Sequence, residues 1–260
     1  MSAQVRVEPG FEGEALPGVV QVTLSNPGKL NAMSRPMWHQ LRQAFVDLQA
    51  RDDVRCIVLR GEGGHFCAGG DISEYPDFRF DEAALRHFHE VEVWGGLSAM
   101  LACDVPLIAC IEGACMGAGV ELASTCDLRL AGQSARFGAP IARLGFPMAP
   151  REVALVRAAA GELSVRQMLL EAATLDAPTL LARGFLTRLL PDDQVAADAR
   201  QSATRIAALA PRAARLNKQT LRALAPVLPQ SLLDQAYAYA DSPEHREGIA
   251  AFLAKRTPAF

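Results

Sequence analysis

The chain has 260 residues, of which 50% are hydrophobic and 21% charged, and its formal net charge is −3. This length suits one large domain, with or without a helical appendage, and the composition is that of an ordinary globular protein. No basic stripe suggests nucleic-acid binding, and no uncharged apolar run approaches the ~20 residues of a membrane helix. The first residues show no signal-peptide pattern, so we expect a cytoplasmic protein without membrane or nucleic-acid partners.

The six cysteines lie mostly in apolar surroundings, and none forms a Cys-x-x-Cys pair. This pattern predicts buried free thiols in a reducing compartment, with neither a structural metal nor a disulfide framework. The cysteines are residues 56, 67, 103, 110, 115 and 126.

Hydrophobic periodicity predicts alternating strands and helices up to about residue 190. The expected strands are 19–24, 54–59, 107–111, 127–131 and 135–137. The expected helices are 35–51 after a Ser34 cap, 82–102 after an Asp81 cap, one around Glu121, and short helices at 151–160, 164–172 and 178–182. Residues 75–80 lose the pattern, and Pro76 favours irregular backbone there.

Alternation of this kind is typical of α/β units with parallel strands. Beyond residue 194 the chain reads as helix throughout, with breaks at Pro211, at 226–229 and at Pro243. We therefore expect an α/β core over residues 1–195 and a helical C-terminal region over 196–260.

The stretch 106–127 is the one around which the chain is organised. A buried strand pattern at 107–111 is followed by glycines at 113, 117 and 119, and then by Glu121 on an apolar helical segment. A strand that passes through glycines into a helix leaves backbone N–H groups free, and these groups hold negative charge well. Glu121 in the next turn is then a candidate acid or base. The alternative is a tight turn with one solvated glutamate.

A second glycine loop, Ala-Gly-Gly at 68–70, also follows a strand and is followed by a carboxylate, Asp71. If both loops present N–H groups to one point, they form an oxyanion hole with two donors. The competing interpretation of Asp71 is that it caps the segment that follows it.

Other catalytic motifs are absent from the sequence: it has no Walker-type loop, no dinucleotide-binding glycine motif and no nucleophile elbow. His87 and His89 do not share a helix face and lack converging metal ligands, so no metal is expected, although either is a possible general base. The carboxylates of the 82–102 helix are expected on a solvated face; they are Glu82, Glu90 and Glu92.

Five ordered motifs resemble those of the crotonase superfamily, also called the enoyl-CoA hydratase/isomerase family. They are Ser-Asn-Pro-Gly-Lys-Leu-Asn-Ala-Met at 25–33, Phe-Cys-Ala-Gly-Gly-Asp-Ile at 66–72, the segment 111–127, Phe-Gly-Ala-Pro at 137–140 and the segment 247–256. The resemblance runs over nearly the whole chain. It implies a spiral of ββα units, a helical C-terminal region that drives trimerisation, and a homotrimer or a hexamer built as a dimer of trimers.

The resemblance also implies an acyl-CoA thioester substrate, with coenzyme A as part of the substrate and no separate cofactor. Gly70 and Ala118 would donate the N–H groups of the oxyanion hole and stabilise a thioester enolate. Ala68 would lie against the adenine end, and Lys29 would meet the coenzyme A phosphates. Asp71 and Ile72 belong to the same coenzyme A-binding motif. The tail residues Phe252 and Lys255 would contact coenzyme A bound to a neighbouring subunit.

The chain departs from the family at one decisive position. Glu121 matches the first of the two glutamates that hydratases of this family use, whereas Ile141 stands where the second belongs. The usual Pro-Gly-x-Gly-Gly is also replaced by Pro-Met-Ala-Pro at 147–150. An isoleucine cannot move a proton, so we expect lyase or isomerase chemistry with Glu121 as the single acid/base.

Three alternatives stay open. One is a hydratase that draws its second acid from elsewhere; the candidates are Glu90, Glu92, His89 and Glu152. Another is a decarboxylase in which the oxyanion hole does most of the catalysis. The last is a non-catalytic protein that binds acyl-CoA.

Overall fold

The computed structural model describes residues 2–223, 230–234 and 237–258. Its main sheet has six strands in the order β1-β2-β3-β4-β6-β9, and β1 alone runs antiparallel to its neighbour. The strands are β1 (Gln4–Pro9), β2 (Val19–Ser25), β3 (Cys56–Gly61), β4 (Leu107–Ile111), β6 (Leu128–Gly132) and β9 (Arg188–Leu190). The predicted strands 19–24, 54–59, 107–111 and 127–131 are confirmed, whereas β1 was not predicted.

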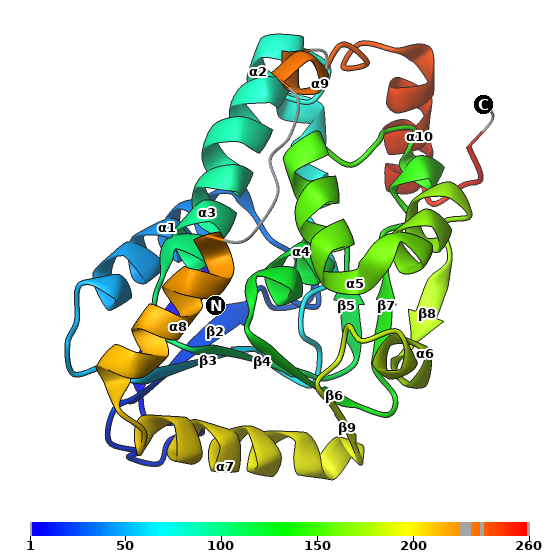
Figure 1. The fold of residues 1–260 in the computed structure, drawn as a ribbon. Helices are drawn as coiled ribbons and strands as arrows, with labels where there is room; N and C mark the ends of the chain where they lie inside the picture. Colours follow the sequence, from blue (N-terminus) through cyan, green and yellow to red (C-terminus); the bar gives the residue numbers. More distant parts are fainter. Residues whose placement is uncertain (1, 224–229, 235–236, 259–260) are drawn as a thin grey trace.

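A second, smaller sheet stands beside the main one and has the order β5-β7-β8 (Figure 1). Its strands are β5 (Ala114–Met116), β7 (Arg136–Gly138) and β8 (Thr174–Asp176). The prediction at 135–137 corresponds to β7. β5 and β8 were not predicted, because three residues are too few to establish an alternating pattern.

Helices cover both faces of the main sheet (Figure 1). On one side lie α1 (Arg35–Gln49), α3 (Trp94–Ala102) and α4 (Ala118–Thr125), and across the other runs α7 (Val195–Ala207). The small buried residues of α7 pack with apolar side chains of β3, β4 and β6. Parallel strands covered on both faces explain why β2 and β4 are buried along their whole length.

The helix predicted from 82 to 102 is a continuous rod of three parts. It consists of α2 (Glu82–His87), the π-helical η2 (Phe88–Val93) and α3, and it follows the 3₁₀ turn η1 (Ile72–Asp77). Asp81 caps α2 by accepting a hydrogen bond from the N–H of Ala84 at 2.8 Å, as predicted. Ser34 stands at the N-cap of α1, but its side chain makes no capping bond.

The remaining helices lie on the second sheet and in the C-terminal region. They are η3 (Ile141–Leu144), α5 (Pro150–Leu170), α6 (Ala177–Ala182), η4 (Asp192–Gln194), α8 (Pro211–Ala223), α9 (Gln230–Asp234) and α10 (Pro243–Leu253). Gly161 has non-helical backbone angles and divides α5 in two, in agreement with the two helices predicted at 151–160 and 164–172. The predicted break at 226–229 lies outside the described residues. Among the described helices, none is long and apolar enough to cross a bilayer.

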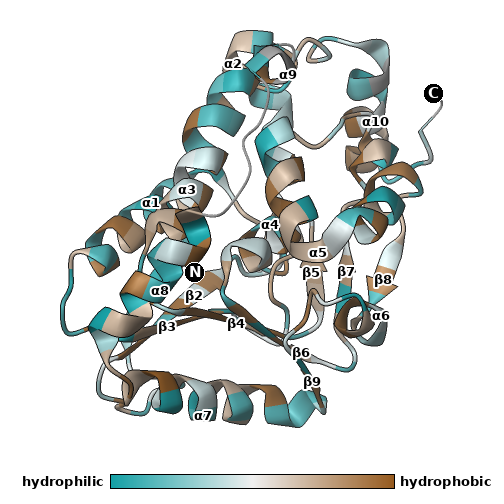
Figure 2. Ribbon diagram, in the orientation of Figure 1, coloured by the Kyte–Doolittle hydropathy of each residue, from teal (hydrophilic) through white to brown (hydrophobic). Residues whose placement is uncertain are grey.

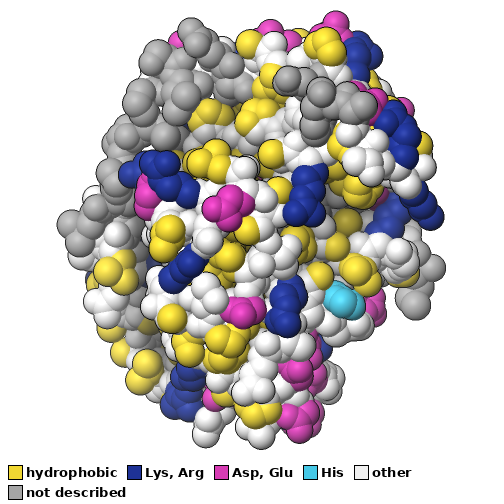
Figure 3. Space-filling model, turned by 90° about the vertical axis from the view of Figure 1, so that its right-hand side faces the viewer, with side chains coloured by type: hydrophobic (Ala, Val, Ile, Leu, Met, Phe, Trp, Pro, Cys, Tyr) yellow, Lys and Arg dark blue, Asp and Glu magenta, His cyan; other side chains and the backbone are white. Residues whose placement is uncertain are grey.

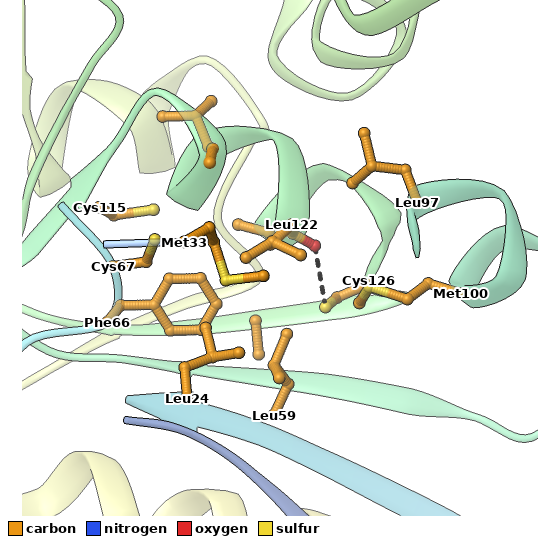
Figure 4. Packing of buried hydrophobic residues seen from close by; sticks show 14 of the residues in the cluster. Leu24, Met33, Leu59, Phe66, Cys67, Leu97, Met100, Cys115, Leu122 and Cys126 are labelled. Atoms are coloured by element: carbon orange, nitrogen blue, oxygen red, sulfur yellow. Dashed lines mark hydrogen bonds between the residues drawn. The ribbon is translucent and has the colours of Figure 1, made fainter. Parts of the chain in front are cut away.

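The apolar core fills the space between the main sheet and the helices α1, α3 and α4, where the strands are strongly hydrophobic (Figure 2). Met33, Phe66 and Leu122 meet there, beside Cys67 and Cys115 (Figure 4). All six cysteines are buried and free, which confirms the prediction for them. Burial raises the pKa of the Cys67 thiol to about 12, so this thiol is protonated at neutral pH.

Candidate active site

Backbone hydrogen bonds bring the two glycine loops together. The N–H of Cys67 donates to the carbonyl of Ala114 at 2.9 Å, and the N–H of Met116 donates to the carbonyl of Cys67 at 2.8 Å. The segment before Gly70 therefore runs parallel to β5, the strand that leads into α4. This ladder places the ends of both loops at the same cavity.

Two glycines make this close approach possible. Gly117 at the N-cap of α4 has a φ of 47°, which favours a residue without a side chain. Gly119 faces the other loop, and a Cβ added there would lie 2.5 Å from the carbonyl oxygen of Cys67. A larger residue at 119 would force the loops apart.

Gly70 and Ala118, the two donors that the resemblance implies, both line the cavity. Within the described residues, neither backbone N–H is assigned a hydrogen-bond partner. Ala118 begins α4, where a helix leaves its first N–H groups unpaired. Unpaired N–H groups beside a cavity are suited to an oxygen that carries negative charge.

The cavity has a volume of about 60 Å³ and is walled mainly by aromatic and apolar side chains. Its polar and charged side chains come from four different segments of the chain. They are Tyr75, Arg79, His89, Glu121 and Glu152.

Glu121 lies on the first turn of α4 and is buried. Burial raises the pKa of this carboxyl well above its usual value, and repulsion from Glu152 raises it further, whereas the charge of Arg79 lowers it. A carboxyl that holds a proton near neutral pH is able to act as either acid or base.

Glu152 on the first turn of α5 is the second buried carboxyl of the cavity. Burial raises its pKa to about 8, against the opposing effect of Arg79. Its Oε1 lies 2.7 Å from Nδ1 of His89, which is buried and whose pKa is lowered well below 6.5 by burial and by Arg79. Of the four candidates for a second acid, the structure brings Glu152 and His89 to the cavity.

The other two candidates are engaged elsewhere. Glu92 has a side-chain exposure of only 1% and forms an ion pair with Arg35. Glu90 accepts hydrogen bonds from Arg151 at 2.9 Å and from the Tyr237 hydroxyl at 2.7 Å. The prediction that Glu92 lies on a solvated helix face is therefore wrong. This face of η2 packs against α1, whose Arg35 binds the Glu92 carboxylate.

Ile141 opens η3 and also lines the cavity, so this wall is apolar at the position where the resemblance implied a second glutamate. Arg79 was missed by the sequence analysis, although it is fully buried and lines the same cavity. The signal available was an arginine between Phe78 and Phe80 in a stretch without secondary-structure pattern.

The residues predicted to bind coenzyme A fall in two places. Lys29 donates to both carboxylate oxygens of Asp71, at 2.9 and 2.7 Å, and to Ser73. Burial alone would raise the pKa of Asp71, but the hydrogen bonds from Lys29 and Ser73 outweigh it and lower the pKa. Asp71 also accepts from the N–H of Ser73 at 3.2 Å, so the capping interpretation holds. Ala68 and Ile72 flank this group and are partly buried.

The tail residues lie apart from this group. Phe252 is half exposed near the end of α10, and Lys255 follows it with a φ of 54°. Both positions are open to solvent in the single chain.

The arrangement of sheet, loops and helices is that of a crotonase-fold enzyme. A solved methylmalonyl-CoA decarboxylase in complex with 2-nitronate-propionyl-CoA matches 100% of this chain and 99% of its own, with a TM-score of 0.86 and 26% identity.

A family profile described as enoyl-CoA hydratase/isomerase matches residues 14–260. The probable enoyl-CoA hydratase echA8 of Mycobacterium bovis is 32% identical over 244 residues, which cover 92% of this chain and 93% of the relative. The 2,3-dehydroadipyl-CoA hydratase of Escherichia coli is 32% identical over 247 residues, covering 93% and 94%. The chain belongs to the enoyl-CoA hydratase/isomerase family.

Proposed function

We propose that the chain transfers protons at carbons next to an acyl-CoA thioester and holds the resulting enolate with the N–H groups of Gly70 and Ala118. The observation that carries this proposal is that two unpaired N–H groups and the buried Glu121 line one cavity. Donors fixed by the backbone stabilise the enolate oxygen without reorganising during the reaction. Glu121 takes a proton from the substrate or returns it.

The position of Glu152 determines which of the candidate reactions we favour. It shares the cavity with Glu121, and its charge helps to raise the pKa of the Glu121 carboxyl. Addition of water across a double bond requires one group to activate the water and another to protonate carbon. The pair supplies both from this chain, so Glu152 performs the role for which Ile141 is unsuited. We therefore favour lyase chemistry of the hydratase type, and double-bond migration by Glu121 alone is the simpler variant of the same site.

Decarboxylation is the second candidate. The structural neighbour named as a methylmalonyl-CoA decarboxylase matches the full length of the chain. Loss of CO₂ from a carboxyacyl thioester leaves the same enolate, which the two N–H groups would stabilise. The two candidates differ in their products and in their dependence on Glu152.

We place coenzyme A along the loop that carries Lys29, Ala68, Asp71 and Ile72. The Lys29 side chain is 45% exposed, so it is able to contact a phosphate while its ammonium stays near Asp71.

Phe252 and Lys255 are assigned to coenzyme A on a neighbouring subunit of a homotrimer or hexamer. Figure 3 shows hydrophobic side chains among charged ones on the side of the molecule toward which α5, α6 and α10 lie in Figure 1. The large exposed hydrophobic side chains of these three helices are Leu163, Leu170, Leu181, Phe252 and Leu253.

The test uses a panel of 2-enoyl-, 3-enoyl- and malonyl-type CoA thioesters with the parent chain and three variants. Glu121→Gln should lower turnover by about 100-fold or more, with CoA-thioester binding within a few-fold of the parent. Glu152→Gln should suppress water addition more strongly than double-bond migration. Glu162→Gln, at an exposed position of α5, serves as the control.

Unchanged turnover in Glu121→Gln would show that Glu121 is not the catalytic acid or base. Equal loss of hydration and migration in Glu152→Gln would contradict its separate role. Micromolar binding without conversion of any thioester would favour the non-catalytic binder.

A further inference from the structure

Arg79 is fully buried and its guanidinium is enclosed by aromatic rings. Its central carbon lies 3.9 Å from the centroid of the Phe146 ring and 4.4 Å from that of Tyr75. Rings at these distances attract the cation and exclude water from it.

Among the described residues, the nitrogen atoms of Arg79 meet neutral acceptors, all at long distance. Nε donates to Nε2 of His245 at 3.3 Å, one terminal nitrogen lies 3.4 Å from Nε2 of His89, and the other donates to the Tyr239 hydroxyl at 3.4 Å. Because arginine is only a donor, both imidazole Nε2 atoms must be acceptors. Their protons then lie on Nδ1, which faces Glu152 in His89 and the carbonyl of Ala240 in His245. Both histidines are neutral in this arrangement.

Arg79 has no direct counter-ion among the side chains that the structure describes: no described carboxylate lies within 4.0 Å of it. Glu121 and Glu152 act on it across the cavity, but burial raises the pKa of both carboxyls and so disfavours the charge that would offset Arg79. A buried cation that contacts neutral groups alone is costly. Such a residue persists where an anion is supplied by the ligand.

The position of Arg79 says where that anion lies. Arg79 lines the same small cavity as Gly70, Ala118 and Glu121. A group attached to a thioester at the two N–H donors therefore reaches Arg79 through a short acyl chain. Trp38, another wall of the cavity, has a buried Nε1–H without a hydrogen-bond partner and offers a further donor.

We propose that Arg79 is the carboxylate-binding residue of the acyl pocket, and that the substrate is a short-chain acyl-CoA whose acyl group ends in its own carboxylate. A carboxylate is flat and matches the fork of a guanidinium, and at the end of a short acyl chain it lies in the same cavity as the two N–H donors. This proposal rests on the proposed function, because it takes the thioester to lie at Gly70 and Ala118.

Two thioesters of equal chain length provide the ligand side of the test: glutaconyl-CoA, which ends in a carboxylate, and 2-pentenoyl-CoA, which ends in a methyl group. Binding to the full-length chain is measured by calorimetry in the Glu121→Gln background, which stops turnover. We expect glutaconyl-CoA to bind about 10- to 100-fold more tightly, as a charge-assisted pair implies. Equal binding, or preference for the uncharged thioester, would overturn the proposal.

Arg79→Met and Arg79→Lys provide the protein side. Arg79→Met should remove the preference for glutaconyl-CoA and leave 2-pentenoyl-CoA binding within a few-fold, while Arg79→Lys should restore part of the preference. Arg42→Met, at an exposed position of α1, should leave both affinities unchanged. An equal loss of both ligands in Arg79→Met would show instead that Arg79 acts only through Glu121 and Glu152.

These readouts separate the two proposals. The binding preference decides the role of Arg79 even if the Glu121→Gln chain still turns over. Such turnover would contradict only the proposed function. If the Arg79 variants do not fold, the comparison of the two ligands on the unaltered arginine still decides.

Discussion

Replacing Glu152 with glutamine tests the buried carboxyl pair through its effect on folding. The pKa of Glu152 rises from 4.5 to about 8 in the folded chain because of burial. Since the folded pKa is the higher one, the stability that the protonated carboxyl contributes is complete below about pH 4.5 and is lost as the pH rises through about 8. Linkage over these two values gives a loss of about 2 kcal/mol in the free energy of unfolding between pH 6 and pH 8.

A glutamine at this position does not titrate. We therefore expect the stability of Glu152→Gln, relative to the parent, to rise by about 2 kcal/mol from pH 6 to pH 8. Urea denaturation followed by circular dichroism at pH 6, 7 and 8 measures this difference. Removal of the charge at 152 also lets Glu121 ionise more easily, which acts in the same direction.

Glu162→Gln serves as the control, because Glu162 lies on the same helix with its side chain 54% exposed. Its ion pairs with Arg157 and Arg166 are exposed and contribute little, so Glu162→Gln should stay within about 1 kcal/mol of the parent at each of the three pH values. A constant difference for Glu152→Gln would refute the reasoning, because it would mean that the Glu152 carboxyl is not held protonated in the folded chain.

Two further substitutions test the packing that positions the site. Gly119→Ala places a Cβ against the Cys67 carbonyl, so it should cost about 1–3 kcal/mol of stability and lower turnover. The control Gly95→Ala, within α3, should be neutral or slightly stabilising. Denaturant titration compares the two variants. Arg35→Met removes the ion-pair partner of the buried Glu92 and should cost about 1–3 kcal/mol, and the added Glu92→Met change should recover much of that loss; a single variant as stable as the parent would contradict the pairing.

Local patterns in the sequence predicted the parts of the site that depend on backbone. The strand at 107–111, the glycines at 117 and 119 and the helix with Glu121 leave signals within a few residues, and the structure has them where expected. The contact between the two loops was a hypothesis, suggested because each loop follows a strand, contains glycines and precedes a carboxylate. The ladder between Cys67 and Ala114 accounts for it physically.

Long-range packing determined the rest, and the sequence does not display it. Glu152 was one of four candidates for a second acid, and the docking of α5 on α4 brings it to the cavity that His89 also lines. A regular helix pattern did not distinguish the surroundings of Glu92 from those of His89. The π-helical turn of η2 changes the direction in which each side chain points. Arg79 depends on rings from η1 and from residue 146, which are far apart in the chain.

Hydrogen bonds between main-chain atoms, rather than side chains, fix the spacing of the Gly70 and Ala118 loops. Side chains on the walls opposite can therefore change without altering that spacing, as Ile141 does at a position where relatives with two glutamates have an acid. Such an architecture separates the part of a reaction that must be conserved from the part that is free to diverge. In evolutionary terms, substitutions on the walls of the cavity alter the groups that would face a substrate, while the main-chain hydrogen bonds between the two loops are inherited intact.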